Sequence, residues 1–166
     1  MMGRMSSLHL RFKPSFTEGY LAYASMAMDS YHFKDRSKHD IMIYVWEPIV
    51  LGQCAILYED EDPRGFVSWG WLDRDQEERF IRHSSRLRDF AHETKDDVPW
   101  ILDMIAPHGF RYVSAIVRGL TKEFSNDPEF DGFSCARALR PCGRLVRFRR
   151  EQKDKIDYEL QMQGST

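Results

Sequence analysis

The feature that most constrains the fold is a short apolar segment that leads through a Pro-His-Gly turn into an amphipathic stretch. Residues 100–109 read WILDMIAPHG, and residues 110–124 read FRYVSAIVRGLTKEF. In the first segment the side chains alternate between two apolar faces, and Asp103 interrupts one of them. The pattern predicts a strand followed by a helix, with a carboxylate held inside an apolar layer.

Asp103 needs a partner, because an unpaired charge buried in an apolar layer costs several kcal/mol. A salt bridge or a tie to the backbone is the simplest role for this carboxylate. A catalytic role stays open, since a histidine oriented by a buried aspartate is a competent general base near neutral pH. The candidate histidines are His32 and His39, beside the expected end of the first helix, and His108 in the turn.

The remaining segments predict further helices and strands. Apolar residues recur at helical spacing over residues 20–31, which indicates a first helix that ends near Ser30 or Phe33. Three segments rich in β-branched and aromatic residues predict an antiparallel meander, at residues 41–46, 50–59 and 65–72. An amphipathic helix over residues 75–93 and two late strands over residues 133–140 and 144–149 are then expected.

Helices alternating with a mainly antiparallel sheet place the chain in the α+β class. We expect a loose arm at residues 1–14, one domain at residues 15–150 and a polar tail at residues 151–166. A strand that leads through a glycine turn into a helix N-terminus favours anion binding, because unpaired N–H groups and the helix dipole point the same way. In this respect the segment resembles GCN5-like acetyltransferases.

Composition and charge exclude several classes of protein. The formal net charge of −2 supplies no global positive field, so bulk nucleic-acid binding is not expected. Three widely spaced cysteines without a CxxC pair predict neither a disulfide framework nor a zinc site, and no metal is expected. No apolar run approaches the ~20 residues of a membrane span, and the N-terminal residues lack the apolar core of a secretory signal. We therefore expect a soluble, cytoplasmic protein.

The segment DVPWILDMIAPHG, at residues 97–109, resembles the toxin-activating lysine acyltransferases of the hemolysin C type. Its most specific part is the Trp-x-x-Asp-x-Ile-Ala-Pro-x-Gly core. A Pro-Ile-x-x-x-Gln stretch at residues 48–53 and the Ser68-Trp69 pair support the resemblance, which covers about residues 20–150. It implies a GCN5-like (GNAT) acyltransferase fold with helices that flank a mixed, mainly antiparallel sheet.

The resemblance also implies a reaction and its partners. Members of the family move a fatty acyl group from acyl carrier protein to the ε-amine of a lysine in a partner protoxin, using a histidine near the end of the first helix and the aspartate of the motif. The aspartate corresponds to Asp103. The histidine corresponds best to His32, with His39 as the fallback.

Further expectations concern the donor and its protein partners. The turn after the strand is expected to hold the acyl donor or to stabilise the oxyanion, through backbone N–H groups and through His108, Gly109, Arg111 and Tyr112. The family commonly has Phe where His108 stands, and a longer loop before the helix. No tightly bound cofactor is expected, and the arginine-rich segment at residues 137–150 is expected to face the acidic acyl carrier protein.

The sequence leaves open the acceptor, the oligomeric state and the class of activity. The acceptor is an RTX-type protoxin or another lysine-bearing protein, and a homodimer is an expectation that comes from the family. A CoA-dependent acetyltransferase of the same fold is one alternative. A catalytically silent phage or virion protein that kept the scaffold is the other, because phage genomes carry members of this family without an adjacent toxin.

Overall fold

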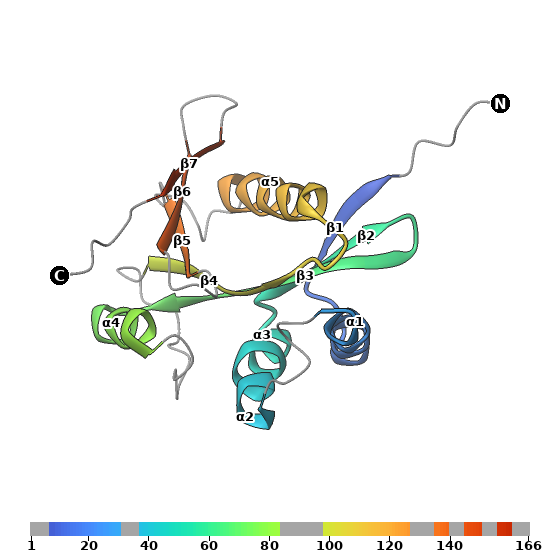
Figure 1. The fold of residues 1–166 in the computed structure, drawn as a ribbon, viewed down its shortest axis with the longest axis horizontal. Helices are drawn as coiled ribbons and strands as arrows, with labels where there is room; N and C mark the ends of the chain where they lie inside the picture. The colour runs from blue at the N-terminus through green and yellow to red at the C-terminus, as the bar shows by residue number, and fades with distance from the viewer. Residues whose placement is uncertain are drawn as a thin grey trace. The chain divides into compact units, whose positions relative to one another are not determined.

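A computed structural model describes residues 7–30, 37–83, 98–126, 135–139, 145–150 and 156–160. Helices and strands alternate along these residues, which confirms the α+β class (Figure 1). In chain order the elements are β1 (Leu8–Phe12), α1 (Phe16–Met28), α2 (Lys38–Ile41), the π-helix η1 (Met42–Trp46), α3 (Glu47–Val50), β2 (Cys54–Glu59), β3 (Asp62–Leu72), α4 (Arg74–His83), β4 (Val98–Ile105), α5 (Phe110–Asn126), β5 (Cys135–Leu139), β6 (Leu145–Arg150) and β7 (Ile156–Leu160).

The chain divides into two compact units. One unit contains Met1–Ser68 and Asp103–Leu120, and the other contains Trp69–Leu102 and Thr121–Thr166. In the first, β1, β2 and β3 pair antiparallel in that order, and β4 is the next strand after β3. In the second, β4 pairs with β5 in parallel, and β5, β6 and β7 pair antiparallel. Because β4 and β5 are parallel, the chain needs a long crossover between them, which contains α5.

Helices cover both faces of the strands in the first unit. Figure 1 shows α1 and α3 on one side of β1–β3 and α5 on the other. Strand β2 is buried over five consecutive residues, so neither of its faces is open to solvent. On the α5 side, glycines allow close approach: a Cβ atom at Gly65 would lie 2.6 Å from Cδ1 of Ile116, and one at Gly119 would lie 2.8 Å from Cδ2 of Leu10.

Helix α1 is fixed to the opposite face by its cap and by one carboxylate. The Ser15 hydroxyl accepts a hydrogen bond from the backbone N–H of Glu18 at 3.3 Å, which caps the first turn. The Glu18 carboxylate accepts from the Tyr58 hydroxyl at 2.9 Å and pairs with Arg11 at 2.5 Å. Strands β1 and β2 therefore both hold the start of α1.

Residues 41–46 form helix, and the expectation of a strand there is wrong. Elements α2, η1 and α3 follow one another without a break from residue 38 to residue 50. Met42 and Trp46 are exposed, whereas Tyr44, Val45 and Ile49 are buried. The buried side chains are thus spaced as on one face of a helix. β-branched and aromatic composition favours a strand only weakly, and burial of one helical stripe against the sheet overrides it.

Most other predicted elements are found close to their expected places. The strand at residues 100–106 is β4, the helix that follows it is α5, and the last two predicted strands correspond to β5 and β6. Five residues of the expected loose arm form β1, which pairs with β2, and five residues of the expected tail form β7. Helix α4 is described to His83, and residues 84–97 lie outside the described part of the chain.

Candidate active site

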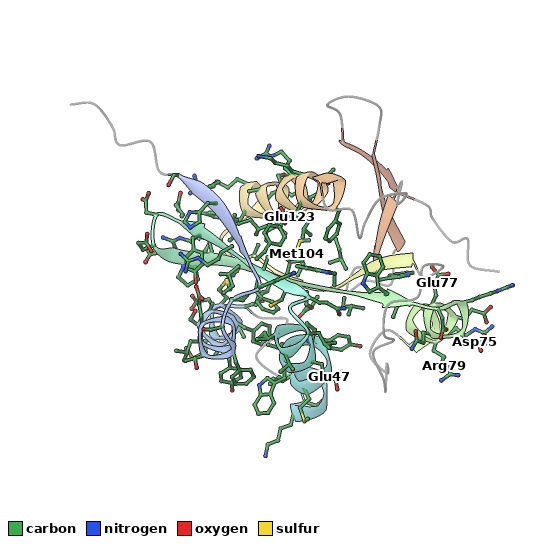
Figure 2. The ribbon with its side chains drawn as sticks, turned by 180° about the vertical axis from the view of Figure 1, so that it is seen from behind. Glu47, Asp75, Glu77, Arg79, Met104 and Glu123 are labelled. Atoms are coloured by element: carbon green, nitrogen blue, oxygen red, sulfur yellow. The ribbon has the colours of Figure 1, made fainter. Side chains whose placement is uncertain are left out.

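Asp103 lies near the C-terminal end of β4 and is only 5% exposed, so its predicted burial is confirmed. Ser68 on β3 is the other buried polar residue of the core formed by the described residues. Figure 2 shows Met104 between the sheet and α5. Because successive side chains of a strand alternate between faces, Asp103 points to the opposite side, where α1 and α3 lie.

Ser68 faces the same side as Asp103 and contacts the helical segment at residues 38–50. Its hydroxyl donates a 2.8 Å hydrogen bond to the backbone carbonyl of Tyr44, in η1. In a regular α-helix this carbonyl would accept from the residue four positions later, which here is Pro48 and has no N–H. The Ser68 hydroxyl is a donor to this carbonyl from outside the helix.

The turn that contains Tyr44 is π-helical. The backbone N–H of Glu47 donates to the carbonyl of Met42, five residues back, as a π-helix requires. In a regular α-helix the Pro48 ring would also clash with the carbonyl four residues before it. The π-helical turn therefore directly precedes the first turn of α3, which contains Pro48.

Helix α3 ends in a Schellman motif that lies within the Pro-Ile-x-x-x-Gln stretch. Gly52 adopts a backbone φ of 69°, which residues other than glycine rarely adopt. The N–H of Gln53 donates to the carbonyl of Pro48 at 2.7 Å, and the N–H of Gly52 donates to that of Ile49 at 3.1 Å. Pro48 and Gln53 are thus the two ends of a helix cap, and the stretch leads directly into β2.

The histidine candidates lie on or before this same segment. The backbone of His39 belongs to α2, directly before the π-helical turn. His32 lies outside the described residues, and so does the side chain of His39. Asp103, Ser68 and the backbone of His39 belong to the same compact unit. The pairing of Asp103 with a histidine stays a prediction.

The turn between β4 and α5 is open at its glycine. Gly109 has a φ of 122°, and no heavy atom lies within 4 Å of the position that a Cβ atom would occupy. His108 is exposed and stacks edge-on against Tyr112, with ring centroids 6.4 Å apart. The glycine side of this turn is therefore open to solvent.

Arg111 and Tyr112 converge on Glu59 at the end of β2. Arg111 donates to one Glu59 carboxylate oxygen at 2.5 Å, and the buried Tyr112 hydroxyl donates to the other at 2.8 Å. Arg64 lies 3.4 Å from the same carboxylate, and the Arg111 guanidinium lies 4.5 Å over the Tyr112 ring. Glu59 was not among the predicted site residues, because a contact across 52 or 53 positions of sequence leaves no local signal.

The other reactive side chains give no competing site among the described residues. Burial raises the pKa of the Cys54 thiol to about 12, so this cysteine stays protonated at neutral pH and is a poor nucleophile. No group of three or more His, Cys, Asp or Glu in the described part of the chain could hold a metal ion. Among the described helices, none has the length and apolar character to cross a membrane.

The arginine-rich strands belong to the second unit. In the antiparallel pair of β5 and β6, Arg137 stands opposite Arg147, and Arg147 stands opposite Glu159 of β7. The pairing of β5, β6 and β7 therefore follows a regular antiparallel register. Their side chains lie outside the described residues, so the expected docking of acyl carrier protein stays a prediction.

Comparison with protein families decides the membership of the chain. The model of the RTX toxin acyltransferase family matches residues 20–148, which include the helical segment, β2, β3, β4 and α5. The chain belongs to this family. Acyl transfer is therefore its class of chemistry, and the fold accords with a GCN5-like acyltransferase. A search of curated proteins found no match.

Proposed function

We propose that this member of the RTX toxin acyltransferase family transfers a fatty acyl group from acyl carrier protein to the ε-amine of a lysine in a partner protein. The observation that supports the proposal is the burial of Asp103 in the core of the matched family region, on the face of the sheet where Ser68 binds the helical segment at residues 38–50. A buried carboxylate in this position suits the task of orienting an imidazole.

His32 acts as the general base in this proposal. A lysine is mostly protonated at neutral pH and must lose a proton to attack a thioester carbonyl. The ammonium first releases one proton to solvent. The neutral amine nitrogen then forms a bond to the acyl carbon and gives its second proton to the imidazole of His32, the carbon–sulfur bond breaks, and the imidazole passes that proton to the departing thiolate. Asp103 fixes the tautomer of His32 and stabilises the imidazolium while it holds the proton.

The donor occupies the open turn between β4 and α5. Gly109 leaves room for the phosphopantetheine arm, and the exposed guanidinium of Arg111 lies in the first turn of α5. Backbone N–H groups at a helix start suit a phosphate or an oxyanion. His108 and Tyr112 flank the turn, and Tyr112 holds Arg111 through the shared contact with Glu59.

The experiment that tests the proposal compares two donors on one acceptor. Purified protein is incubated with an RTX protoxin and either palmitoyl-acyl carrier protein or acetyl-CoA, and lysine modification is read by mass spectrometry. We expect a palmitoyl mass on lysine from the first donor only. Transfer from acetyl-CoA alone would replace the proposal with the CoA-dependent alternative, and transfer from neither donor would favour a silent scaffold.

A further inference from the structure

Three exposed aromatic side chains pack against one another where α1 meets η1. Phe16 and Tyr20 stack with ring centroids 6.2 Å apart, and both meet Trp46 edge-on, at 5.3 and 6.1 Å. In the same order, the three residues remain 43%, 37% and 40% exposed. Their rings are therefore one continuous apolar surface rather than scattered exposed residues. We call this surface of Phe16, Tyr20 and Trp46 the aromatic face.

Further apolar residues extend the aromatic face along both helical segments. On α1, residues 19–28 contain no Asp, Glu, Lys or Arg, and Leu21 is exposed next to Tyr20. On the other segment, Met42 and Val50 stand one turn before and one turn after Trp46, and both are exposed. A surface helix normally carries charged or polar side chains on its outer side. Over these residues α1 carries no charge, which favours contact with an apolar partner.

The aromatic face joins the outer sides of two neighbouring helical segments. Figure 1 shows α1 and α3 side by side on one side of β1–β3. Trp46 contacts both Phe16 and Tyr20 across the boundary between the segments. A helical protein partner binds by placing side chains in an apolar groove. Here the rings contact each other across the boundary, and such a surface suits a partner whose shape adapts to it.

The aromatic face has the chemistry of a membrane–water interface. Trp and Tyr combine a large apolar ring with one polar N–H or O–H group, and they gather at the level of the lipid headgroups. Trp46 and Tyr20 are both partly exposed, so their rings are accessible to lipid. A lipid surface is deformable and needs no matching groove in the protein.

Two lysines flank the aromatic face. Lys38 is exposed one helical turn before Met42. The exposed Lys13 runs along Gly52, with its Cγ 3.4 Å from the position that a Cβ atom would occupy there, so it lies beside the end of α3. Neither lysine forms an ion pair with another described residue. An anionic lipid surface attracts each such lysine by about fivefold in affinity.

The described acidic side chains of these helices do not cancel the two cations. Glu18 lies toward β1 and β2, where Arg11 pairs with it. Glu47 is only partly exposed, and Asp29 lies beyond the last residue of α1. The charges beside the aromatic face are therefore complementary to an anionic surface.

We propose that the aromatic face docks the protein on the surface of an anionic lipid bilayer. The rings of Phe16, Tyr20 and Trp46 enter the headgroup region, and Lys13 and Lys38 contact lipid phosphates. Docking is peripheral and requires no change of fold. The proposal goes beyond acyl transfer and does not depend on it, because its test uses neither donor nor acceptor.

Tryptophan fluorescence supplies the measurement. All four tryptophans lie within the described residues, and Trp69, Trp71 and Trp100 are at most 4% exposed. Added lipid therefore reports on Trp46. The full-length protein is titrated with vesicles of phosphatidylcholine alone or mixed with phosphatidylglycerol. We expect a blue shift of the emission on the anionic vesicles, and quenching by lipid that is brominated near the headgroup end of its acyl chains.

Two serine substitutions test the aromatic face while they keep the reporter Trp46. Phe16→Ser combined with Tyr20→Ser should lower the partition coefficient on anionic vesicles by about tenfold or more, because both rings leave water on docking. Phe110→Ser is the matched control. Phe110 is 70% exposed at the start of α5, on the other side of the strands (Figure 1), so this variant should bind like the wild type.

The lysines predict a dependence on lipid charge. Lys13→Gln combined with Lys38→Gln should lower the affinity for anionic vesicles about tenfold and leave the affinity for phosphatidylcholine vesicles unchanged. Lys122→Gln, at an exposed lysine of α5, is the control and should leave both affinities unchanged. Far-UV circular dichroism verifies the fold of each variant. Should the double serine variant unfold, Tyr20→Ser alone and the lysine pair test the proposal.

Three results would overturn the proposal. One is an emission of Trp46 that vesicles of either composition leave unchanged. Another is a folded double serine variant that partitions as the wild type does. The third is a wild type that ignores lipid but self-associates or binds acyl carrier protein through these rings, as shown by loss of that binding in the double serine variant. The aromatic face would then bind a second copy or that protein.

Discussion

At the scale of single residues, the choice between His32 and His39 is the sharpest prediction. His32 matches the family pattern best, and His39 lies in α2. We expect His32→Ala to lower kcat by about 100- to 10,000-fold, the contribution of a general base. His39→Ala serves as its matched control and should retain kcat within about threefold. The assay is single-turnover transfer from palmitoyl-acyl carrier protein, and the reverse ranking would make His39 the base.

The contacts of Glu18 predict that the stability of the fold depends on pH. Burial alone would raise the pKa of this carboxyl, but hydrogen bonds from Tyr58 and Arg11 outweigh it, and the pKa is lowered from 4.5. Because the pKa of Glu18 is lower in the folded than in the unfolded state, its carboxylate stabilises the fold at pH values above the unfolded-state pKa. This stabilisation is lost as the pH falls through the folded-state pKa. Glu18→Gln should therefore cost about 1 kcal/mol of unfolding free energy at pH 7 and much less at pH 3.

Urea denaturation at the two pH values measures this difference. The glutamine keeps an acceptor for the Tyr58 hydroxyl, so the comparison isolates the charge of Glu18. A destabilisation of equal size at both pH values would show that the charge is not the source of the effect.

Replacement of Arg111 is expected to weaken donor binding without a change in the rate of the chemical step. Its guanidinium is exposed beside the open turn, and Glu59 holds it in place. We expect Arg111→Gln to raise the KM for acyl carrier protein about three- to tenfold and to weaken its salt dependence, with kcat preserved. Arg74→Gln, at an exposed arginine of α4, is the control. An unchanged KM would place the donor away from this turn.

At the scale of elements, the contact between β3 and α5 depends on Gly65. A Cβ atom there would lie 2.6 Å from Cδ1 of Ile116, a fully buried side chain. We expect Gly65→Ala to lower the unfolding free energy by about 1–3 kcal/mol, through overpacking. Ile116→Val removes the atom in question at a cost of about 1 kcal/mol.

The combination of the two changes tests the cause. In the Ile116→Val background, Gly65→Ala should cost at least about 0.5 kcal/mol less than in the wild type, because the clash is absent. Thermal or urea unfolding of the four proteins gives the comparison. Additive losses would mean that the penalty comes from backbone conformation rather than from Ile116.

Residues 41–46 show where sequence reasoning about elements fails. Their composition favours a strand, and only the burial of Tyr44 and Val45 against the sheet, with Met42 and Trp46 left exposed, reveals the helix. The strand and helix around Asp103 were predicted correctly, because a strong alternation, a glycine turn and a helical stripe follow one another there. Local signals predict an element well when neighbouring parts of the chain do not compete with them.

At the scale of the whole molecule, the class of fold and the burial of Asp103 were predicted from the sequence. The region that matches the family contains the motif at residues 100–109 on which the resemblance depended. Long-range partners were out of reach. Glu59 meets Arg111 across 52 positions, and Ser68 meets Tyr44 across 24, so neither pair leaves a periodic trace in the sequence.

The unit that contains Met1–Ser68 and Asp103–Leu120 holds Asp103 and the residues proposed for donor binding. The central claim for that unit is that Asp103 supports the base that activates lysine. Asp103→Asn tests it most directly, because asparagine keeps the size of the side chain and removes its charge.

The decisive measurement is the single-turnover rate of palmitoyl transfer to protoxin lysine for the wild type and for Asp103→Asn, each shown to be folded by near-UV circular dichroism. The account predicts a fall of about 100- to 10,000-fold in the variant, with donor binding retained. A folded Asp103→Asn protein that transfers the acyl group within about twofold of the wild-type rate would contradict it.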